Sequence, residues 1–239
     1  MIYDGTTAIG NGISDASRQT GTSTFNDLYN NNMYVGFMYT NGQAHGFGTE
    51  STIKKTLDTW YSSNLASYRS KIDTNTGFCN DRGSSTTNVG APNGAGGTGT
   101  VTTYYAASYR LYSNKMPSLK CTDRANDYFT VSGANVGNKK LNNPIGLITA
   151  DEAAYAGGVN GSDNKNYYLY TGQQYWTMSP SQFNNNSGMA TMFAVNPNGN
   201  LSEGSSVHGM NGVKPVINLR ADTVFSSGDG TSSNPYIVE

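Results

Sequence analysis

The sequence predicts an α+β domain in which short strands, two helices and long loops surround one core. Its 239 residues are enough for a sizeable core, and no linker long enough to divide the chain is present. Only 13% of residues are charged, and polarity comes instead from 29 glycines and as many asparagines, which favour turns. Seventeen tyrosines and eight phenylalanines supply apolar surface for burial, which excludes a disordered chain.

The N-terminal third predicts one strand and the clearest helix. Residues 1–33 are turn-rich, and residues 34–239 are expected to form the core of a single domain, 1–239. Residues 34–39 form an aromatic strand that ends at the turn signal Asn41-Gly42. A helix is predicted over residues 51–71, with Ser51 as its N-cap and apolar residues at helical spacing.

The middle of the chain predicts a glycine-rich loop followed by strands. Residues 83–100 are rich in Gly, Ser, Thr and Asn, and residues 94–99 match the dinucleotide-binding fingerprint. That fingerprint requires a helix behind it, whereas here the loop leads into residues 101–112, whose period of two predicts a strand. Two more strands are predicted over residues 127–131 and 144–148.

The C-terminal part predicts a short helix and then regularly spaced strands. Residues 149–152 form a capping box that opens a helix over residues 149–157, and two glycines end it. Turns such as Asn196-Pro-Asn-Gly199 separate the strands. The predicted strands span residues 167–170, 175–178, 189–195, 213–219 and 235–238. The strand at 175–178 is expected to end at Ser179-Pro180, with Trp176 as a core residue.

Two cysteines, Cys79 and Cys121, are present. They can form a disulfide, which would indicate an oxidising compartment, or remain two separate buried thiols. We predict the disulfide, and we expect it to pin the loop at 83–100 to the core.

Charge and hydropathy exclude two classes of partner. A formal net charge of −1 gives no electrostatic footprint for nucleic acid. The longest apolar runs have four or five residues, so no segment predicts a membrane span, and no signal peptide is visible at the N-terminus.

Metal and catalytic motifs are sparse. His45 and His208 lie far from each other and from the cysteines, so no metal cluster is predicted and both histidines are expected on surface loops. Asp163 and Asp229 could each offer oxygens to calcium, but neither lies in a twelve-residue calcium loop, and Asx turns explain both. The Gly-x-Ser-x-Gly motif is absent, while a Ser/His/Asp set assembled from distant segments stays open.

Seven motifs in a fixed order resemble one bacterial family. They are Phe78-Cys-Asn-Asp-Arg82, Pro117-Ser-Leu-Lys-Cys121, Pro144-Ile-Gly-Leu-Ile-Thr-Ala-Asp-Glu-Ala153, Asn166-Tyr-Tyr-Leu-Tyr-Thr-Gly172, Tyr175-Trp-Thr-Met-Ser-Pro180, Val213-Lys-Pro-Val-Ile-Asn-Leu219 and Gly228-Asp-Gly-Thr231. The chain from about residue 34 resembles the surface-protein domain of unknown function 6273, which is common in gut Firmicutes. Its ending is similar to C-type-lectin-like and formylglycine-enzyme-like folds.

The resemblance implies a fold and leaves the activity open. It implies two helices around short, twisted antiparallel sheets, with long loops that present a binding face. It also implies a further strand upstream of a segment like residues 2–5, so residues 1–33 are expected to lack that strand. Formylglycine-generating activity is not implied, because the catalytic cysteine pair of those enzymes has no counterpart near the C-terminus of this sequence.

We therefore expect an extracellular or cell-surface binding or adhesion module without catalytic activity or cofactor. Its partner would be a protein or glycan ligand on a surface. The expected binding loops are residues 182–188 and 203–211, with Asn184, Asn185, Asn186 and His208 as candidate contacts. Trp60 and Trp176 are expected in the core. The alternatives are a structural subunit of a pilus-like or phage-tail-like fibre, which would contact sister subunits, and an uncharacterised hydrolase.

Overall fold

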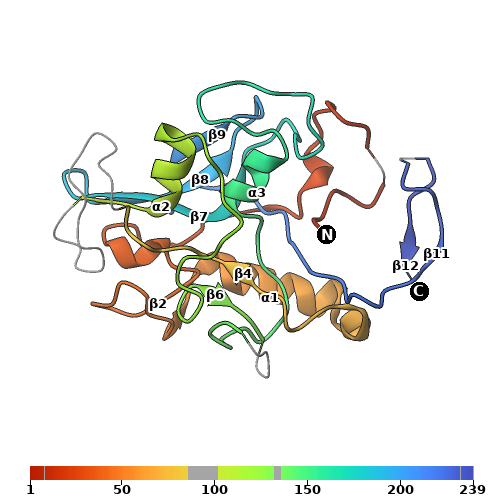
Figure 1. Ribbon diagram of the computed structural model, residues 1–239, viewed down its shortest axis with the longest axis horizontal. Helices are drawn as coiled ribbons and strands as arrows, with labels where there is room; N and C mark the ends of the chain where they lie inside the picture. The colour runs from red at the N-terminus through yellow and green to blue at the C-terminus, as the bar shows by residue number, and fades with distance from the viewer. Residues whose placement is uncertain (8, 86–101, 132–135, 232, 239) are drawn as a thin grey trace.

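A six-stranded mixed sheet forms the centre of the molecule (Figure 1). The computed structural model describes residues 1–7, 9–85, 102–131, 136–231 and 233–238. The sheet has the order β1-β10-β7-β8-β9, and β5 pairs with β7 as well. All pairs are antiparallel except β10 with β7. Its strands are β1 (Thr22–Ser23), β5 (Thr103–Tyr104), β7 (Tyr175–Asn184), β8 (Met189–Val195), β9 (Leu201–Ser206) and β10 (Asn211–Gly212).

Both faces of this sheet are covered, which explains why β7 and β8 are buried along almost their whole length. Trp176 and Met192 belong to the apolar cluster on one face, together with residues of α1 (Thr52–Asn64). Tyr175 and Phe193 belong to the cluster on the other face, together with residues of α2 and α3. The alternation of side chains along a strand therefore separates two cores.

Two capped α-helices flank the sheet. The side chain of Ser51 accepts a hydrogen bond from the backbone N–H of Lys54 and so caps α1, which buries Ile53, Leu57 and Tyr61. Thr149 and Glu152 form the capping box of α3 (Ala150–Tyr155). The other helical turns are η1 (Ala16–Arg18), η2 (Asn32–Val35), η3 (Ala66–Lys71), α2 (Ala106–Ser108) and the π-helical η4 (Tyr109–Ser113).

Three two-stranded sheets lie around this core. β2 (Met38–Tyr39) pairs with β3 (Thr49–Glu50), and β4 (Phe78–Cys79) pairs with β6 (Tyr128–Phe129). The third is a C-terminal hairpin of β11 (Phe225–Ser227) and β12 (Ile237–Val238), which stands at one edge of the molecule (Figure 1). These elements confirm the coarse prediction of a mixed α+β protein with short sheets and few helices.

Several predicted strands are wrong. Of the predicted strand 101–112, residues 102–112 are described, and within them only β5 is a strand; the chain then turns into α2 and η4 because Ala107, Ser108 and Leu111 are buried at helical spacing. Residues 167–170 form a turn, closed by a hydrogen bond from Tyr170 N to Tyr167 O. Residues 144–148 and 213–219 contribute isolated bridges, and residues 94–99 lie outside the described ranges.

β7 does not end at Ser179-Pro180, as predicted, but continues to Asn184. The register between β7 and β8 shifts on both sides of Pro180, so that the proline sits at an irregularity where its missing N–H is tolerated. No helix among the described residues is both long and apolar enough to cross a lipid bilayer.

Candidate functional site

Cys79 and Cys121 form a disulfide, which confirms the predicted pair. The bond links β4 to the segment that follows η4. The predicted attachment of the loop at 83–100 concerns residues that lie largely outside the described ranges. Both cysteines line a polar hollow, which is described below.

The residues that follow Cys79 are buried polar groups, and the first of them, Asn80, is held by the surrounding backbone. Asn80 accepts a hydrogen bond from Phe37 N at 2.8 Å and donates to the carbonyl oxygens of Val35 and Met178. Such buried groups are tolerated only when they are hydrogen-bonded, so Asn80 ties η2 and β7 to β4.

Arg82 joins the same region through a buried ion pair. Its Nε donates to Asp127 Oδ1 at 2.7 Å, and its Nη1 donates to the carbonyl oxygens of Met38 and Gly46. Both side chains are almost completely buried. Each of these two buried charges therefore has an oppositely charged partner and hydrogen bonds, which offset the cost of removing a charge from water.

His45 binds the other oxygen of this carboxylate. Its Nδ1 lies 3.0 Å from Asp127 Oδ2, and this hydrogen bond raises the pKa of His45. Burial alone would raise the pKa of Asp127, but His45 and Arg82 outweigh it and hold that pKa below its usual value. His45 thus lies in a loop, as predicted, but its side chain is only partly exposed because it pairs with Asp127, which its local sequence did not indicate.

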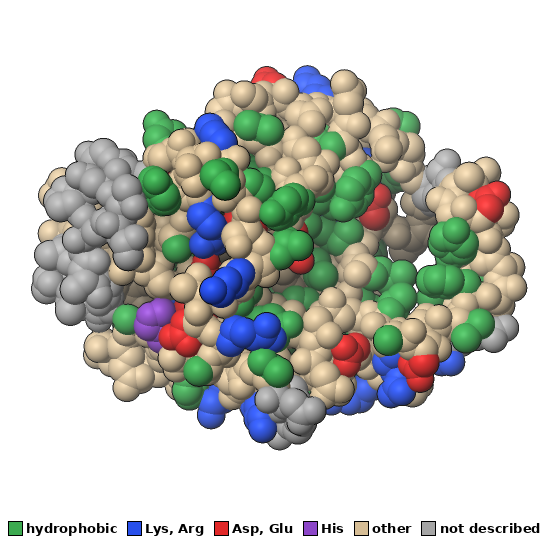
Figure 2. All heavy atoms as spheres, viewed as in Figure 1, with side chains coloured by type: hydrophobic (Ala, Val, Ile, Leu, Met, Phe, Trp, Pro, Cys, Tyr) green, Lys and Arg blue, Asp and Glu red, His purple; other side chains and the backbone are tan. Residues whose placement is uncertain are grey.

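We call the hollow beside the disulfide the polar cleft. Its volume is about 260 Å³, and it lies between β4, β6, α3 and residues 118–124. Its charged lining residues are Asp81, Asp151, Glu152, Arg110, Lys120 and Arg124. Figure 2 shows Lys and Arg side chains in a row across this face of the molecule, with acidic side chains between them.

Arg110 bridges two buried carboxylates in the polar cleft. Its Nη2 donates to Asp81 Oδ2 at 2.7 Å and to Asp151 Oδ2 at 2.8 Å, while its Nε donates to Asp151 Oδ1. Burial would lower the pKa of Arg110, but the two carboxylates outweigh it and raise that pKa. One guanidinium therefore pairs with two carboxylates, so the three groups together keep an excess of negative charge.

Asp81 is the unusual member of this group. Its backbone has a φ of 28°, in the left-handed region that non-glycine residues seldom occupy. Its Oδ1 is buried and has no hydrogen-bond partner among the residues that the structure describes. A buried oxygen without a partner costs about 1–3 kcal/mol or more, so its presence calls for an explanation.

Two further cations, Lys120 and Arg124, line the polar cleft. Arg124 lies over the ring of Tyr128, 4.4 Å from its centroid, and both Lys120 and Arg124 are exposed. Within the described ranges neither forms an ion pair with a carboxylate. Within the described residues, Lys120 and Arg124 therefore lack the carboxylate partners that Arg110 has.

The predicted loop residues come together at one end of the sheet. Asn184 ends β7 and accepts hydrogen bonds from the N–H groups of Asn186 and Ser187, while Asn185 and Asn186 are exposed in the turn to β8. The adjacent loop is held against the start of β8, since Val207 N donates to Ala190 O.

His208 lies in that adjacent loop and is exposed, stacked on Tyr29 with centroids 4.2 Å apart. Its Nδ1 lies 2.7 Å from Ser206 Oγ. The predicted loop bounds were too wide, because residues 182–184 belong to β7 and residues 203–206 to β9.

The two calcium candidates are held in local hydrogen bonds. Asp163 Oδ1 accepts from the side chains of Asn198 and Asn200, and Asp229 Oδ1 accepts from Thr231 N. In the described part of the chain, no group of three or more His, Cys, Asp or Glu side chains is placed to hold a metal ion.

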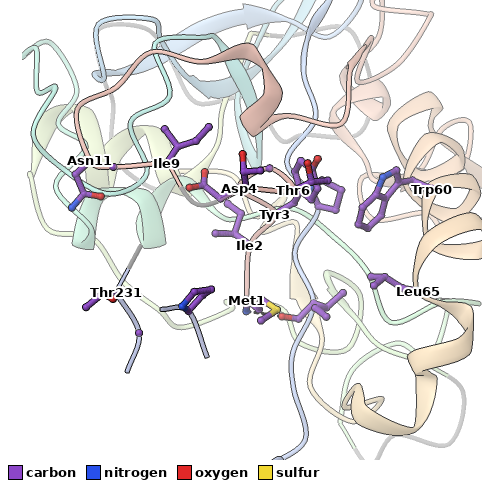
Figure 3. Close-up of a pocket in the computed structure, with 17 residues that line it drawn as sticks. Met1, Ile2, Tyr3, Asp4, Thr6, Ile9, Asn11, Trp60, Leu65 and Thr231 are labelled. Carbon is purple, nitrogen blue, oxygen red and sulfur yellow. Dashed lines mark hydrogen bonds between the residues drawn. The ribbon is translucent and has the colours of Figure 1, made fainter. Parts of the chain in front are cut away.

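A second, larger hollow lies near the N-terminus, and we call it the apolar cleft (Figure 3). It encloses about 750 Å³ between residues 1–7 and 9–11, the end of α1 and the C-terminal hairpin. Trp60 lines it and packs edge-on against Tyr3, with centroids 5.6 Å apart. Trp60 is therefore only partly buried, at the margin of the core, whereas Trp176 is completely buried.

A charge cluster of two buried cations and the partly exposed Asp4 lies at one side of the apolar cleft. Asp4 accepts hydrogen bonds from Arg18 and from Lys214, whose side chains are buried. Burial lowers the pKa of Lys214, and its bond to Asp4 opposes this shift. Because these contacts join residues 4, 18 and 214, the cluster fixes the N-terminal segment to the sheet.

Comparison of the chain with protein-family models, curated proteins and solved structures gives no match. The resemblance to domain of unknown function 6273 therefore stays a prediction, and function has to be argued from the clefts and loops themselves.

Proposed function

We propose that this protein is an extracellular or cell-surface ligand-binding or adhesion module without catalytic activity, on a C-type-lectin-like fold. The polar cleft is its ligand site. The observation that carries this proposal is the buried Oδ1 of Asp81, which has no partner within the described residues although the cleft reaches Asp81. A bound ligand that donates a hydrogen bond would satisfy this oxygen.

The surroundings of Asp81 support a binding role. Arg110 holds the other carboxylate oxygen, and Arg110 is itself fixed by Asp151, which accepts a further hydrogen bond from Ser118 N. A preorganised acceptor needs little reordering when a ligand arrives, which favours affinity. The disulfide beside it is typical of proteins in oxidising compartments, which supports an extracellular location.

The proposal is tested by comparing two sets of variants on a glycan array and on immobilised mucin. Asp81→Asn removes the negative charge of the carboxylate that is proposed to accept the ligand's hydrogen bond in the polar cleft. The quadruple alanine variant of Asn184, Asn185, Asn186 and His208 removes the predicted loop contacts. Asp222→Asn is the matched control, since Asp222 is an exposed carboxylate paired with an exposed arginine.

We expect Asp81→Asn to weaken retention at least ten-fold, while the control leaves it unchanged. Loss of retention in the quadruple variant alone would move the site to the end of the sheet. Equal retention by all variants, each with an unchanged circular dichroism spectrum, would contradict a ligand site at either place.

A fibre subunit is the second candidate, and the C-terminal hairpin is the observation that favours it. Its apolar side chains Val224, Phe225, Tyr236 and Ile237 are exposed, and the rings of Phe225 and Tyr236 stack on each other. An isolated hairpin is marginally stable in water, so a neighbouring subunit could cover this one. Light scattering after size exclusion separates the two functions: a fibre subunit forms oligomers that Phe225→Ser abolishes, and a binding module stays monomeric.

A further inference from the structure

We infer that the polar cleft binds one neutral sugar residue through two adjacent hydroxyl groups. This inference rests on the proposed function, because it names the ligand of the same site. Three observations carry it: a buried acceptor and two cations lie beside each other, the charges of the lining balance, and the walls include apolar side chains.

The segment around Cys121 is fixed next to the acceptor without a partner. Cys121 is bonded to Cys79, which precedes Asp81 by two residues, and the two cysteine Cα atoms are 5.7 Å apart. Ser118 N donates to Asp151 Oδ1 at 2.8 Å, which ties the start of the same segment to the second carboxylate. The side chains of this segment therefore line the cleft beside the two carboxylates.

Two cations of this segment can act as donors to the same ligand. Lys120 and Arg124 line the cleft, and neither has a carboxylate partner within the described ranges. A hydroxyl group both donates and accepts hydrogen bonds. One hydroxyl of a ligand can therefore donate to Asp81 Oδ1 while its neighbour accepts from a cation. Two adjacent hydroxyls of a sugar ring offer this pattern.

The charges of the lining disfavour a charged ligand. The described lining residues carry three carboxylates and three cations, and acidic side chains lie between the Lys and Arg side chains on this face (Figure 2). A ligand carboxylate would come close to Asp81 and Asp151, and a ligand ammonium would come close to Lys120 and Arg124. Like charges at short range repel, and removing a charge from water is expensive. A neutral ligand avoids both penalties.

The size and the apolar walls of the cleft favour a single sugar residue. Its volume of about 260 Å³ is below the range of roughly 300–1,000 Å³ that holds drug-sized ligands. Phe78, Leu119 and Leu147 line it together with the polar groups. The C–H groups of a sugar ring can pack on such side chains while its hydroxyls reach the polar ones. A small primary amide offers similar hydrogen bonds but lacks this apolar face.

Calorimetric titration with glucose, galactose and mannose as neutral probes tests this inference. Glucuronic acid, glucosamine and propionamide represent the acid, the amine and the amide. At least one neutral hexose should bind the native protein more tightly than each of these three. Added salt should leave the affinity of that hexose almost unchanged, because a neutral ligand has no charge to screen.

Three variants test the contacts of the hexose. Asp81→Asn should weaken its binding roughly ten-fold or more, since a hydrogen bond to a charged group is lost. The double variant Lys120→Met/Arg124→Met should also weaken it, and should at the same time raise the affinity for glucosamine, because two positive charges leave the cleft. Arg220→Met is the control, since Arg220 is an exposed arginine that does not line the cleft. General damage to the fold would weaken every probe together.

The outcomes separate this inference from the proposed function. Tighter binding of glucuronic acid or glucosamine than of any hexose would overturn the neutral ligand and leave the site intact. Tighter binding of propionamide would overturn the sugar. Absence of binding by all six probes also overturns the inference. The proposed ligand site then stands if Asp81→Asn lowers retention on the glycan array or on mucin, and it falls as well if that variant is retained like the native protein.

Discussion

Trp176 is the largest completely buried side chain among the described residues. It is completely buried, its Nε1 donates to Ser23 O at 2.8 Å, and its ring packs edge-on against Phe25. Trp176→Ala should therefore lower the free energy of unfolding by about 3–5 kcal/mol, through a large cavity and an orphaned carbonyl. Urea denaturation measures this. Trp60→Ala is the matched control, and it should lower that free energy less, since Trp60 lines a cleft.

His45 makes stability depend on pH in a defined direction. Because its pKa is raised in the folded protein, its ion pair with Asp127 stabilises the fold fully below the unfolded pKa of about 6.5. That contribution is lost as pH rises through the folded pKa. The charged groups that face His45 are Asp127, Asp123 and Arg82.

Thermal unfolding at about pH 6 and about pH 9 checks this expectation. The native protein should lose more stability over this interval than His45→Gln does. His208→Gln, which removes the other histidine of the chain, should behave like the native protein. An identical pH dependence in all three proteins would contradict the role of His45.

The sequence predicts a single side chain well when its role is set by its own chemistry. Trp176 is apolar and large, so burial follows, and two lone cysteines readily suggest a pair. The Arg82–Asp127–His45 ion pair could not be found in this way. Its members lie on three separate segments, and each has an ordinary local sequence that gives no hint of the others.

At the scale of elements, patterns decided by local hydrogen bonds were predicted best. The N-cap at Ser51, the capping box at Thr149 and strand β8 all match the prediction. Residues 101–112 were misassigned because their alternating side chains also fit a helical turn. Ser108 fixes the helical choice, since its Oγ donates to Ser181 O on β7.

The disulfide should stabilise the fold through the unfolded state. Cys79 and Cys121 are 42 residues apart, and closing such a loop contributes about 4 kcal/mol on the chain-entropy model. We expect the free energy of unfolding of the Cys79→Ala/Cys121→Ala variant to be lower by about 4 kcal/mol, so that its midpoint of urea denaturation falls. The same loss should follow reduction of the native protein. An unchanged urea midpoint in both the variant and the reduced protein would contradict this prediction, and would show that the unfolded chain is already restricted without the disulfide.

At the scale of the whole molecule, the C-terminal hairpin is separable from the core. None of the described residues after Leu219 is buried, and neither apolar cluster contains one of them. Deletion of residues 221–239 should leave the melting temperature within a few degrees of the native value, as surface changes do. Deletion of residues 211–239 also removes β10 and the 213–219 segment, and that chain should show no cooperative melting.

The pairing of β1 with β10 has a consequence for the order in which the molecule is assembled. Thr22 pairs with Gly212, and Ile2 pairs with Val216. Residues near the N-terminus are therefore paired with residues that are synthesised near the end of the chain. Contacts between such distant residues slow folding, because a long loop must close before they form. A growing chain therefore cannot complete its central sheet until about nine-tenths of it has been synthesised.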